Sequence, residues 1–532
     1  MEVVDSISQD AAGKTLMGHP RGLFLLFLVE MWERFSYYGM RALLVLYLVH
    51  ESAGLNPGRG WSKADASNLY GWYTGLAYLL PLVGGIIADK FIGTHRSMVI
   101  GSIVIAMGHV ALAISGFGSL VHSELGMSVF VMGLALIIVG TGHFKPTVSV
   151  MVGQLYARDD PRRDGAFTIF YMGINVGAFI CAFVCGTLGE KIGWHWGFGS
   201  AAVGMILGLF TYLLGKPVYL KDVGSPPDGK PNYSPWFVLA AIFISAAVAM
   251  LYYAGFFTWI ERCSDLVCGT SFAGVIPIGV TAVVIVWSAC FIRRQAQDDR
   301  GPTACILMFI IFNAFFWLAF EQAGSSLNFF ADEKTNRWIT LPAIGLWEMP
   351  ATWFQSVNPL LIILFGPVFA ALWPWLARCN RNPSQPMKIA IALLLVGAGY
   401  IFMVVGAMKA TPVAAKAGMF WLLATYTLHT LGELCISPTG LSFVTRAAPV
   451  RLVSFLMGIW FLSSFVANKL GGTVAAQIEK IEHGQINLFW YRWFKLGGQA
   501  DFFLMFVISS ITAGVIVLLM TPWLKRLLHG RE

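Results

Sequence analysis

Long apolar runs recur along this chain, and their length is the first clue to its architecture. A helix needs about 20 mostly apolar residues to cross a bilayer. By that rule the pattern predicts fourteen spans, near 22–50, 68–88, 97–117, 127–152, 167–188, 195–215, 236–257, 273–293, 302–321, 357–377, 387–408, 418–439, 452–473 and 501–524. Because the number is even, both ends of the chain are expected on one side of the membrane.

The composition agrees with this pattern. Of the 532 residues, 57% are hydrophobic and 12% are charged, and the mean hydropathy is +0.68. Such a chain has too little polar material to coat a soluble globule, so a soluble amphipathic first helix is disfavoured. We therefore predict an all-α polytopic membrane protein.

Basic residues in every second loop identify the cytoplasmic side. Examples are Lys90 with Arg96 and Arg293 with Arg294. By the positive-inside rule both termini are cytoplasmic, in a chain expected to lie in the inner (plasma) membrane of the cell. The net charge of +8 then reflects these loops, and no groove typical of nucleic-acid binding is visible.

The order of the spans predicts a domain plan. We expect a tail at 1–21, a six-helix bundle at 22–215, a linker with two additional helices at 216–300, a second six-helix bundle at 301–524, and a tail at 525–532. Six plus six with a central insertion indicates two similar halves around a midplane cavity. Cys263 and Cys268 share a predicted outward-facing loop, where they either form a disulfide or remain free thiols.

The first span carries a polar stripe within the run from Glu30 to Tyr47. Its positions recur at i, i+3, i+4, i+7, i+8 and i+11, so they project from one side of a helix. They are Glu30, Glu33, Arg34, Tyr37, Tyr38 and Arg41. A charge at the centre of a bilayer costs roughly 2.5 to 3.5 kcal/mol, so the surface facing this stripe must supply partners or water.

Other deep ionisable residues come from both halves, namely Lys145, Glu321 and Glu433. Taken with the first span, four acids face three bases, and one bound proton would neutralise the set. A nearly neutral set avoids a large electrostatic barrier during a transport cycle. Glu321 lies close to the end of its predicted span, so a structural ion pair is the alternative interpretation for that residue.

Further polar or aromatic groups fall in register with these charges. Trp317 lies one helical turn before Glu321, and Ser437 lies one turn after Glu433. Trp460 lies in the middle of its span, where packing is the alternative to ligand contact.

Several motifs resemble one family. The run ExxERFSYYG from Glu30 to Gly39 resembles the signature of the proton-dependent oligopeptide transporters, of bacterial type, a branch of the major facilitator superfamily. Four further stretches agree in order, namely FKPTVSVMVGQLY from Phe144, FYMGINVGAF from Phe170, FWLAFEQAGSS from Phe316 and GELCISPTGLS from Gly432. Thr147 departs from the pattern, because the family more often has Asn there. The resemblance implies a major facilitator fold of two six-helix bundles, with the two extra helices between them.

The resemblance also implies roles for particular residues. A short peptide is a zwitterion, so a general peptide carrier holds both termini and leaves room for side chains. Arg41 and Lys145 would hold the carboxylate, and Glu433 with Asn175 and Asn358 would hold the amino group. The pockets would be lined by Tyr37, Tyr38, Tyr78, Trp317, Ser437 and Trp460. The proton-coupling set would comprise Glu30, Glu33, Arg34, Lys145 and Glu321.

The expected function is proton-coupled symport of di- and tripeptides by alternating access, carried out by a monomer with no metal and no cofactor other than the proton. A transporter of an anion such as nitrate on the same fold is the strongest alternative, since Arg41 and Lys145 could bind an anion. An enzyme is disfavoured because no nucleotide-binding loop or metal-spaced ligand set is found. A channel would need a pore ring instead of a pocket of mixed charge.

Overall fold

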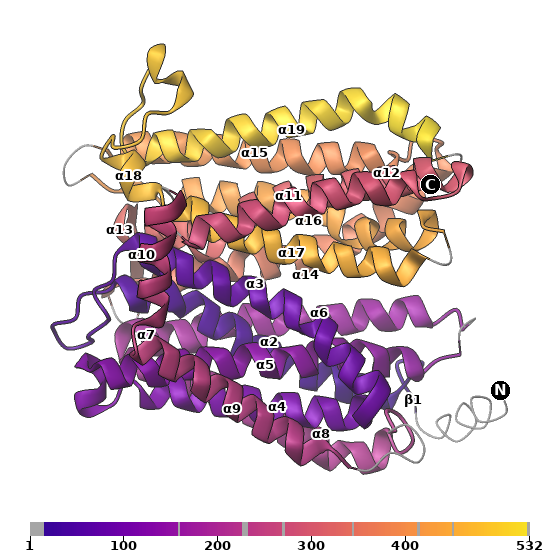
Figure 1. Ribbon diagram of the computed structural model, residues 1–532, viewed down its shortest axis with the longest axis horizontal. Helices are drawn as coiled ribbons and strands as arrows, with labels where there is room; N and C mark the ends of the chain where they lie inside the picture. Colours follow the sequence, from indigo (N-terminus) through magenta and orange to yellow (C-terminus); the bar gives the residue numbers. More distant parts are fainter. Residues whose placement is uncertain are drawn as a thin grey trace. The chain divides into compact units, whose positions relative to one another are not determined.

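The computed structural model describes residues 15–157, 160–225, 232–268, 272–342, 345–411, 415–449 and 452–528. Long helices dominate it (Figure 1). Fourteen of them match the predicted spans one for one: α2 (Arg21–Val49), α3 (Lys63–Ile87), α4 (Gly93–Ile114), α5 (Glu124–Gln154), α6 (Arg163–Cys181), α8 (Trp194–Tyr219), α9 (Ser234–Tyr253), α11 (Phe272–Arg293), α12 (Gln297–Phe320), α14 (Val357–Arg378), α15 (Gln385–Lys409), α16 (Phe420–Ala447), α17 (Val453–Ala475) and α19 (Gln499–Leu527). The all-α prediction with fourteen long helices is confirmed.

Short elements join or extend these helices. They are the π-helical turns η2 (Ala88–Ile92) and η4 (Ala182–Gly186), the 3₁₀ turns η3 (Gly118–His122), η5 (Glu321–Gly324), η6 (Ala351–Ser356) and η8 (Phe489–Arg492), and the helices α7 (Thr187–Lys191), α10 (Phe256–Cys268), α13 (Ser326–Glu333) and α18 (Ile478–Glu482). The loop cysteine pair cannot be judged here, because the side chain of Cys268 lies outside the described residues.

Strands are few and short in the described part of the chain. β1 (Thr15–Leu16) pairs antiparallel with β2 (His19–Pro20), and β3 (Thr335–Asn336) pairs parallel with β6 (Ala417–Gly418). β4 (Trp338–Leu341) pairs antiparallel with β5 (Gly345–Glu348), with Thr340 opposite Leu346. β1 and β2 directly precede α2, whereas the other four strands lie in connections between helices.

The polar stripe sets α2 apart from the other long helices. Within the described residues, nine helical segments are long and apolar enough to span a membrane when at most two charged residues are allowed in an 18-residue window. α2 does not meet this criterion because its four stripe charges lie between Glu30 and Arg41. Its length of 29 residues is nevertheless ample for a span.

The helices form two compact units. Unit 1 comprises Met1–Gly60 and Leu76–Thr258, and unit 2 comprises Trp61–Gly75 and Trp259–Glu532. The two extra helices are divided between them, because α9 packs on α4 and α5 while α11 packs on α12 and α17. The first part of α3 packs in unit 2 and its last part in unit 1. The domain limits drawn from the sequence stay a prediction.

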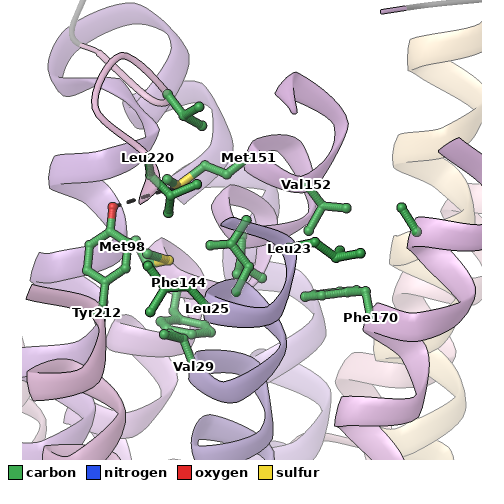
Figure 2. Packing of buried hydrophobic residues seen from close by; sticks show 14 of the residues in the cluster. Leu23, Leu25, Val29, Met98, Phe144, Met151, Val152, Phe170, Tyr212 and Leu220 are labelled. Carbon is green, nitrogen blue, oxygen red and sulfur yellow. Dashed lines mark hydrogen bonds between the residues drawn. The ribbon is translucent and has the colours of Figure 1, made fainter. Parts of the chain in front are cut away.

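The core of unit 1 holds the start of α2 in place. Leu23, Leu25 and Val29 are buried among side chains of α4, α5, α6 and α8, as Figure 2 shows. In the same cluster the Tyr212 hydroxyl lies 3.9 Å from the sulfur of Met151. Within lipid such contacts stabilise through close packing more than through exclusion of water. This apolar anchor precedes the polar stripe, which begins at Glu30.

A close approach of α3 to α5 fixes the region around Lys145. Pro146 has no N–H, so the carbonyl of Gly142 four residues earlier cannot accept the usual helical hydrogen bond from it. That carbonyl lies against Gly84 of α3, so near that a Cβ at Gly84 would collide with it. The absence of a side chain at Gly84 therefore lets α3 pack directly on the turn of α5 that presents Lys145.

Candidate functional site

The stripe of α2 contains a buried charge cluster. The exposed fractions of Glu30, Glu33 and Arg34 are 2%, 0% and 5%. The Arg34 Nε lies 2.7 Å from Glu30 Oε1 and 2.8 Å from Glu33 Oε2. One cation thus faces two carboxylates in a site shielded from water, which is the kind of cluster that the sequence predicted.

The two carboxylates differ in their hydrogen bonds. The single N–H at Arg34 Nε is donated to Glu30 Oε1. Both carboxylate oxygens of Glu33 are buried without a hydrogen-bond partner among the described residues. A buried carboxylate that accepts no hydrogen bond is stabilised by a proton more than one that does. Glu33 thus differs from Glu30 in its surroundings, and a role for it in proton coupling stays a prediction.

The rest of the stripe is aromatic and basic. The Arg34 guanidinium lies 5.7 Å from the Tyr37 ring centroid, and the Arg41 guanidinium lies 5.6 Å from the Tyr38 ring centroid. The two tyrosine rings meet edge to face, with centroids 5.3 Å apart. These contacts orient Arg41, which is 7% exposed, with a planar group able to bind a carboxylate through two parallel hydrogen bonds.

Lys145 joins the same cluster from α5. Its Nζ lies 3.6 Å from the centroid of the Tyr78 ring, which α3 supplies. Its charge also acts on the carboxylate of Glu33. Unit 1 therefore brings together α2, α3 and α5 around one set of charges.

Asn175, a further binding candidate of unit 1, is 4% exposed and lies in α6. Its Nδ2 donates to the backbone carbonyl of Tyr171 one turn earlier at 3.0 Å. This bond fixes the orientation of the side-chain amide. A role for Asn175 in binding a ligand stays a prediction.

Unit 2 holds the predicted acidic centre. Asn358 on α14 donates from Nδ2 to Glu433 Oε2 at 2.8 Å and is 3.0 Å from Thr430 Oγ1. Glu433 is 7% exposed, so its carboxylate is held in position in a nearly dry environment. The sequence predicted that Asn358 and Glu433 act together, and the structure brings them into contact. Thr430, one turn earlier on α16, was not predicted.

The other unit 2 candidates lie on α12, η5, α16 and α17. The Trp317 Nε1 donates to Asn313 Oδ1 at 3.1 Å, and Trp460 is 9% exposed. Glu321 is 5% exposed and begins η5, at the end of α12. Ser437 is half-buried on α16. Both readings of Glu321, a place in the proton-coupling set and a structural ion pair, stay predictions.

The charge inventory from sequence was incomplete. Lys469 on α17 is 0% exposed and Lys388 at the start of α15 is 4% exposed. Both lie within predicted spans, at 452–473 and 387–408, so a charge scan extended to the ends of the spans would have found them. With Lys388 and Lys469 included, five bases face the four acids of the deep set. No group of His, Cys, Asp and Glu among the described residues is arranged to hold a metal ion.

Comparisons with known proteins identify the family. A model of the POT family matches residues 95–491. The chain is 37% identical over 529 residues to the uncharacterised transporter YclF of Bacillus subtilis, covering 99% of this chain and 98% of YclF. It is 35% identical to the peptide transporter YePEPT of Yersinia enterocolitica, covering 98% of this chain and 97% of that protein. A solved structure of a peptide transporter of the POT family in complex with sulfate superimposes with a TM-score of 0.78 at 32% identity, covering 98% and 99% of the two chains.

These likenesses extend over nearly the whole chain. The chain belongs to the POT family, and it has the major facilitator fold. The family resemblance inferred from the motifs is confirmed.

Proposed function

We propose that this protein is a proton-coupled symporter that imports di- and tripeptides by alternating access. Relatives over nearly their full length are named peptide transporters in Yersinia and di-/tripeptide transporters in Lactococcus lactis. The environment of Glu33 is the observation that carries the coupling part of the proposal. Glu33 is a fully buried carboxylate next to Arg34 that accepts no hydrogen bond from the part of the chain that the structure describes, so its protonation changes the local charge balance.

The proposed cycle begins with Glu33 ionised and electrostatically balanced by Arg34 and Lys145. Protonation of Glu33 removes one negative charge, so these two cations interact less strongly with the cluster. Lys145 then becomes available to bind a carboxylate, while Glu30 still accepts the hydrogen bond from Arg34. Proton binding and peptide binding therefore favour each other.

The two units offer groups suited to opposite ends of a peptide. In unit 1, Arg41 and Lys145 would bind the C-terminal carboxylate. In unit 2, the Glu433 carboxylate held by Asn358 would bind the N-terminal ammonium. Tyr37, Tyr38, Tyr78, Trp317, Ser437 and Trp460 would line the space for the side chains, and Asn175 would add a hydrogen bond to the peptide. One solved relative of the POT family is described in complex with a thioalcohol-conjugated peptide, which supports a peptide as the class of ligand.

An anion such as nitrate is the second candidate substrate. The observation in its favour is the pair of cations in unit 1, and a solved relative is described in complex with sulfate. Glu433 argues against it, because a buried carboxylate raises the cost of placing an anion nearby and suits an ammonium ion.

The test is uptake into proteoliposomes with an imposed pH gradient, acid outside, using a labelled dipeptide. We expect accumulation that collapses when the gradient is removed. Unlabelled di- and tripeptides should compete, whereas nitrate at the same concentration should not. Competition by nitrate without competition by peptides would replace the peptide proposal with the anion proposal.

The remaining assignments complete the proposal. The protein would lie in the inner membrane with both termini in the cytoplasm, as the basic loops indicate. It would act as a monomer and need no cofactor beyond the transported proton. Glu321 of unit 2 would take part in coupling proton movement to transport.

A further inference from the structure

A seam of small residues joins the first part of α3 to α17 within unit 2. Ser67, Gly71 and Gly75 recur every four residues, so they form one face of α3. A Cβ at Gly71 would lie 3.1 Å from the Cα of Gly472, and a Cβ at Gly472 would lie 2.5 Å from the Ser67 carbonyl oxygen. The two helices thus touch backbone to backbone, as small residues allow inside a membrane.

A buried charge lies beside this seam. Lys469 of α17 is 0% exposed. Its Nζ lies 4.9 Å from the centroid of the Trp72 ring and donates to Asn68 Oδ1 at 3.4 Å. Asn68 and Trp72 are one turn apart on α3, so the ammonium group of Lys469 on α17 contacts α3.

Near its beginning, α3 also contacts α13. The Lys63 Nζ lies 2.7 Å from Glu333 Oε2 at the end of α13. The seam is tightly packed where Gly71 meets Gly472, yet the Lys469 ammonium ion is buried beside it.

The energetic consequence follows from the cost of burying an ion. Removing an ammonium ion from water carries a desolvation cost, which contacts with an aromatic face and an amide offset in part. Close packing favours the closed seam, whereas hydration of Lys469 favours the open one. The two effects oppose each other, so the free energies of the closed and the open seam differ little.

We propose that Lys469 is a positioning residue for the transport cycle, whose buried charge keeps the seam between α3 and α17 able to open. The inference rests on the proposed alternating access, in which packed helices must separate in each cycle. A purely structural role predicts the opposite sign, because Lys469 would then hold the seam closed. The direction in which a substitution of Lys469 shifts the seam, toward closed or toward open, therefore separates the two roles.

The test measures the seam directly and needs no substrate. Spin labels are placed at Asp65→Cys on α3 and His483→Cys just after α18, both exposed positions in unit 2, after the native cysteines have been replaced. Pulsed electron spin resonance in lipid then gives the distribution of distances between the labels. The ratio that is followed is the population of molecules with the short distance divided by the population with the long distance. Gly71→Leu, which overfills the seam, calibrates the assay by lowering this ratio.

Lys469→Met keeps a long side chain and removes the charge. We expect it to raise the ratio at least threefold, to slow peptide uptake and counterflow together, and to leave the melting temperature unchanged or higher. Lys469→Arg, which keeps the charge, should resemble the wild type. An unchanged or lower ratio in Lys469→Met overturns the proposal.

A second variant keeps the proposal testable in two cases. In one, the wild type already shows only the short distance, and in the other, the Lys469→Met protein does not fold. Asn68→Leu leaves the charge in the seam with one polar contact fewer, so it should lower the ratio at least threefold. Combining it with Lys469→Met should restore the short distance. No shift in Asn68→Leu would overturn the proposal. Because distances are measured without peptide, a failure of the proposed transport function would not be confused with this result.

Discussion

The side-chain amide of Asn358 donates a hydrogen bond to the carboxylate of Glu433, with 2.8 Å between Nδ2 and Oε2. The two residues come from α14 and α16, which are separated in sequence by the whole of α15. This bond holds an acid in a nearly dry part of unit 2, where it suits a positively charged ligand group.

The first prediction follows from that bond. Asn358→Leu should weaken binding of a free dipeptide by about 1.5 to 3 kcal/mol, because Glu433 loses a charged hydrogen bond and its fixed position. An N-acetylated dipeptide, which has no ammonium group, should lose little. Calorimetric titration of both ligands checks this, and Asn468→Leu, another buried asparagine of unit 2 whose amide bonds to its own helix at Ser464, serves as the control. Equal losses for the two ligands would remove Glu433 as the ammonium site.

A second prediction concerns Arg41. If its guanidinium binds the peptide carboxylate through two parallel hydrogen bonds, Lys cannot replace it even though the charge is kept. Arg41→Lys should then lower dipeptide affinity by roughly 1.5 to 3 kcal/mol. The matched dipeptide amide should bind the wild type weakly and lose little more in the variant. A common loss for both ligands, with lower expression, would instead indicate a structural ion pair.

A third prediction tests the contact of Lys145 with the face of Tyr78. Tyr78→Phe keeps an aromatic face and should retain dipeptide affinity close to that of the wild type. Tyr78→Leu removes the face and should weaken binding by about 0.5 to 2 kcal/mol, the range for a cation over an aromatic ring. Should Phe prove as harmful as Leu, the hydroxyl group and not the ring would be the important feature. Equilibrium binding on the three proteins is sufficient to decide.

Neighbouring glycines give a stability test with a built-in control. Gly84→Ala should destabilise the protein by about 1 to 3 kcal/mol, because its Cβ would collide with the Gly142 carbonyl. Gly85→Ala should be nearly neutral, because its Cβ would lie 3.6 Å from Pro146 Cβ, an ordinary contact. Thermal unfolding in detergent measures both. Similar melting temperatures for the two variants would show that α3 and α5 can separate at little cost.

The sequence was a good guide to the helices, since each spanning segment is a local property of some 20 consecutive residues. It also predicted the stripe of α2, because spacing along one helix determines which residues share a face. The partnership of Asn358 with Glu433 came from the family resemblance, and no spacing rule would have supplied it.

Contacts between distant segments were beyond local reasoning. Thr430 was missed because its role depends on how α16 meets α14. Lys469 was missed because it lies near the end of its span, where lysines often extend to the headgroups, and its burial depends on Asn68 and Trp72 of α3. The unequal hydrogen bonding of Glu30 and Glu33 likewise depends on side-chain geometry that a helical pattern does not contain.

The central claim is that Glu33 carries the coupling proton, and Glu33→Gln tests it most directly. The substitution keeps the shape of the side chain and makes it permanently neutral, as protonation would. In proteoliposomes the variant should exchange internal for external dipeptide at a rate close to that of the wild type, because exchange needs no net proton movement. It should fail to accumulate dipeptide against a gradient when the pH outside is lowered, whereas Ser36→Ala, a neighbouring buried change on α2, should still accumulate it. Continued proton-driven accumulation by Glu33→Gln would contradict the account.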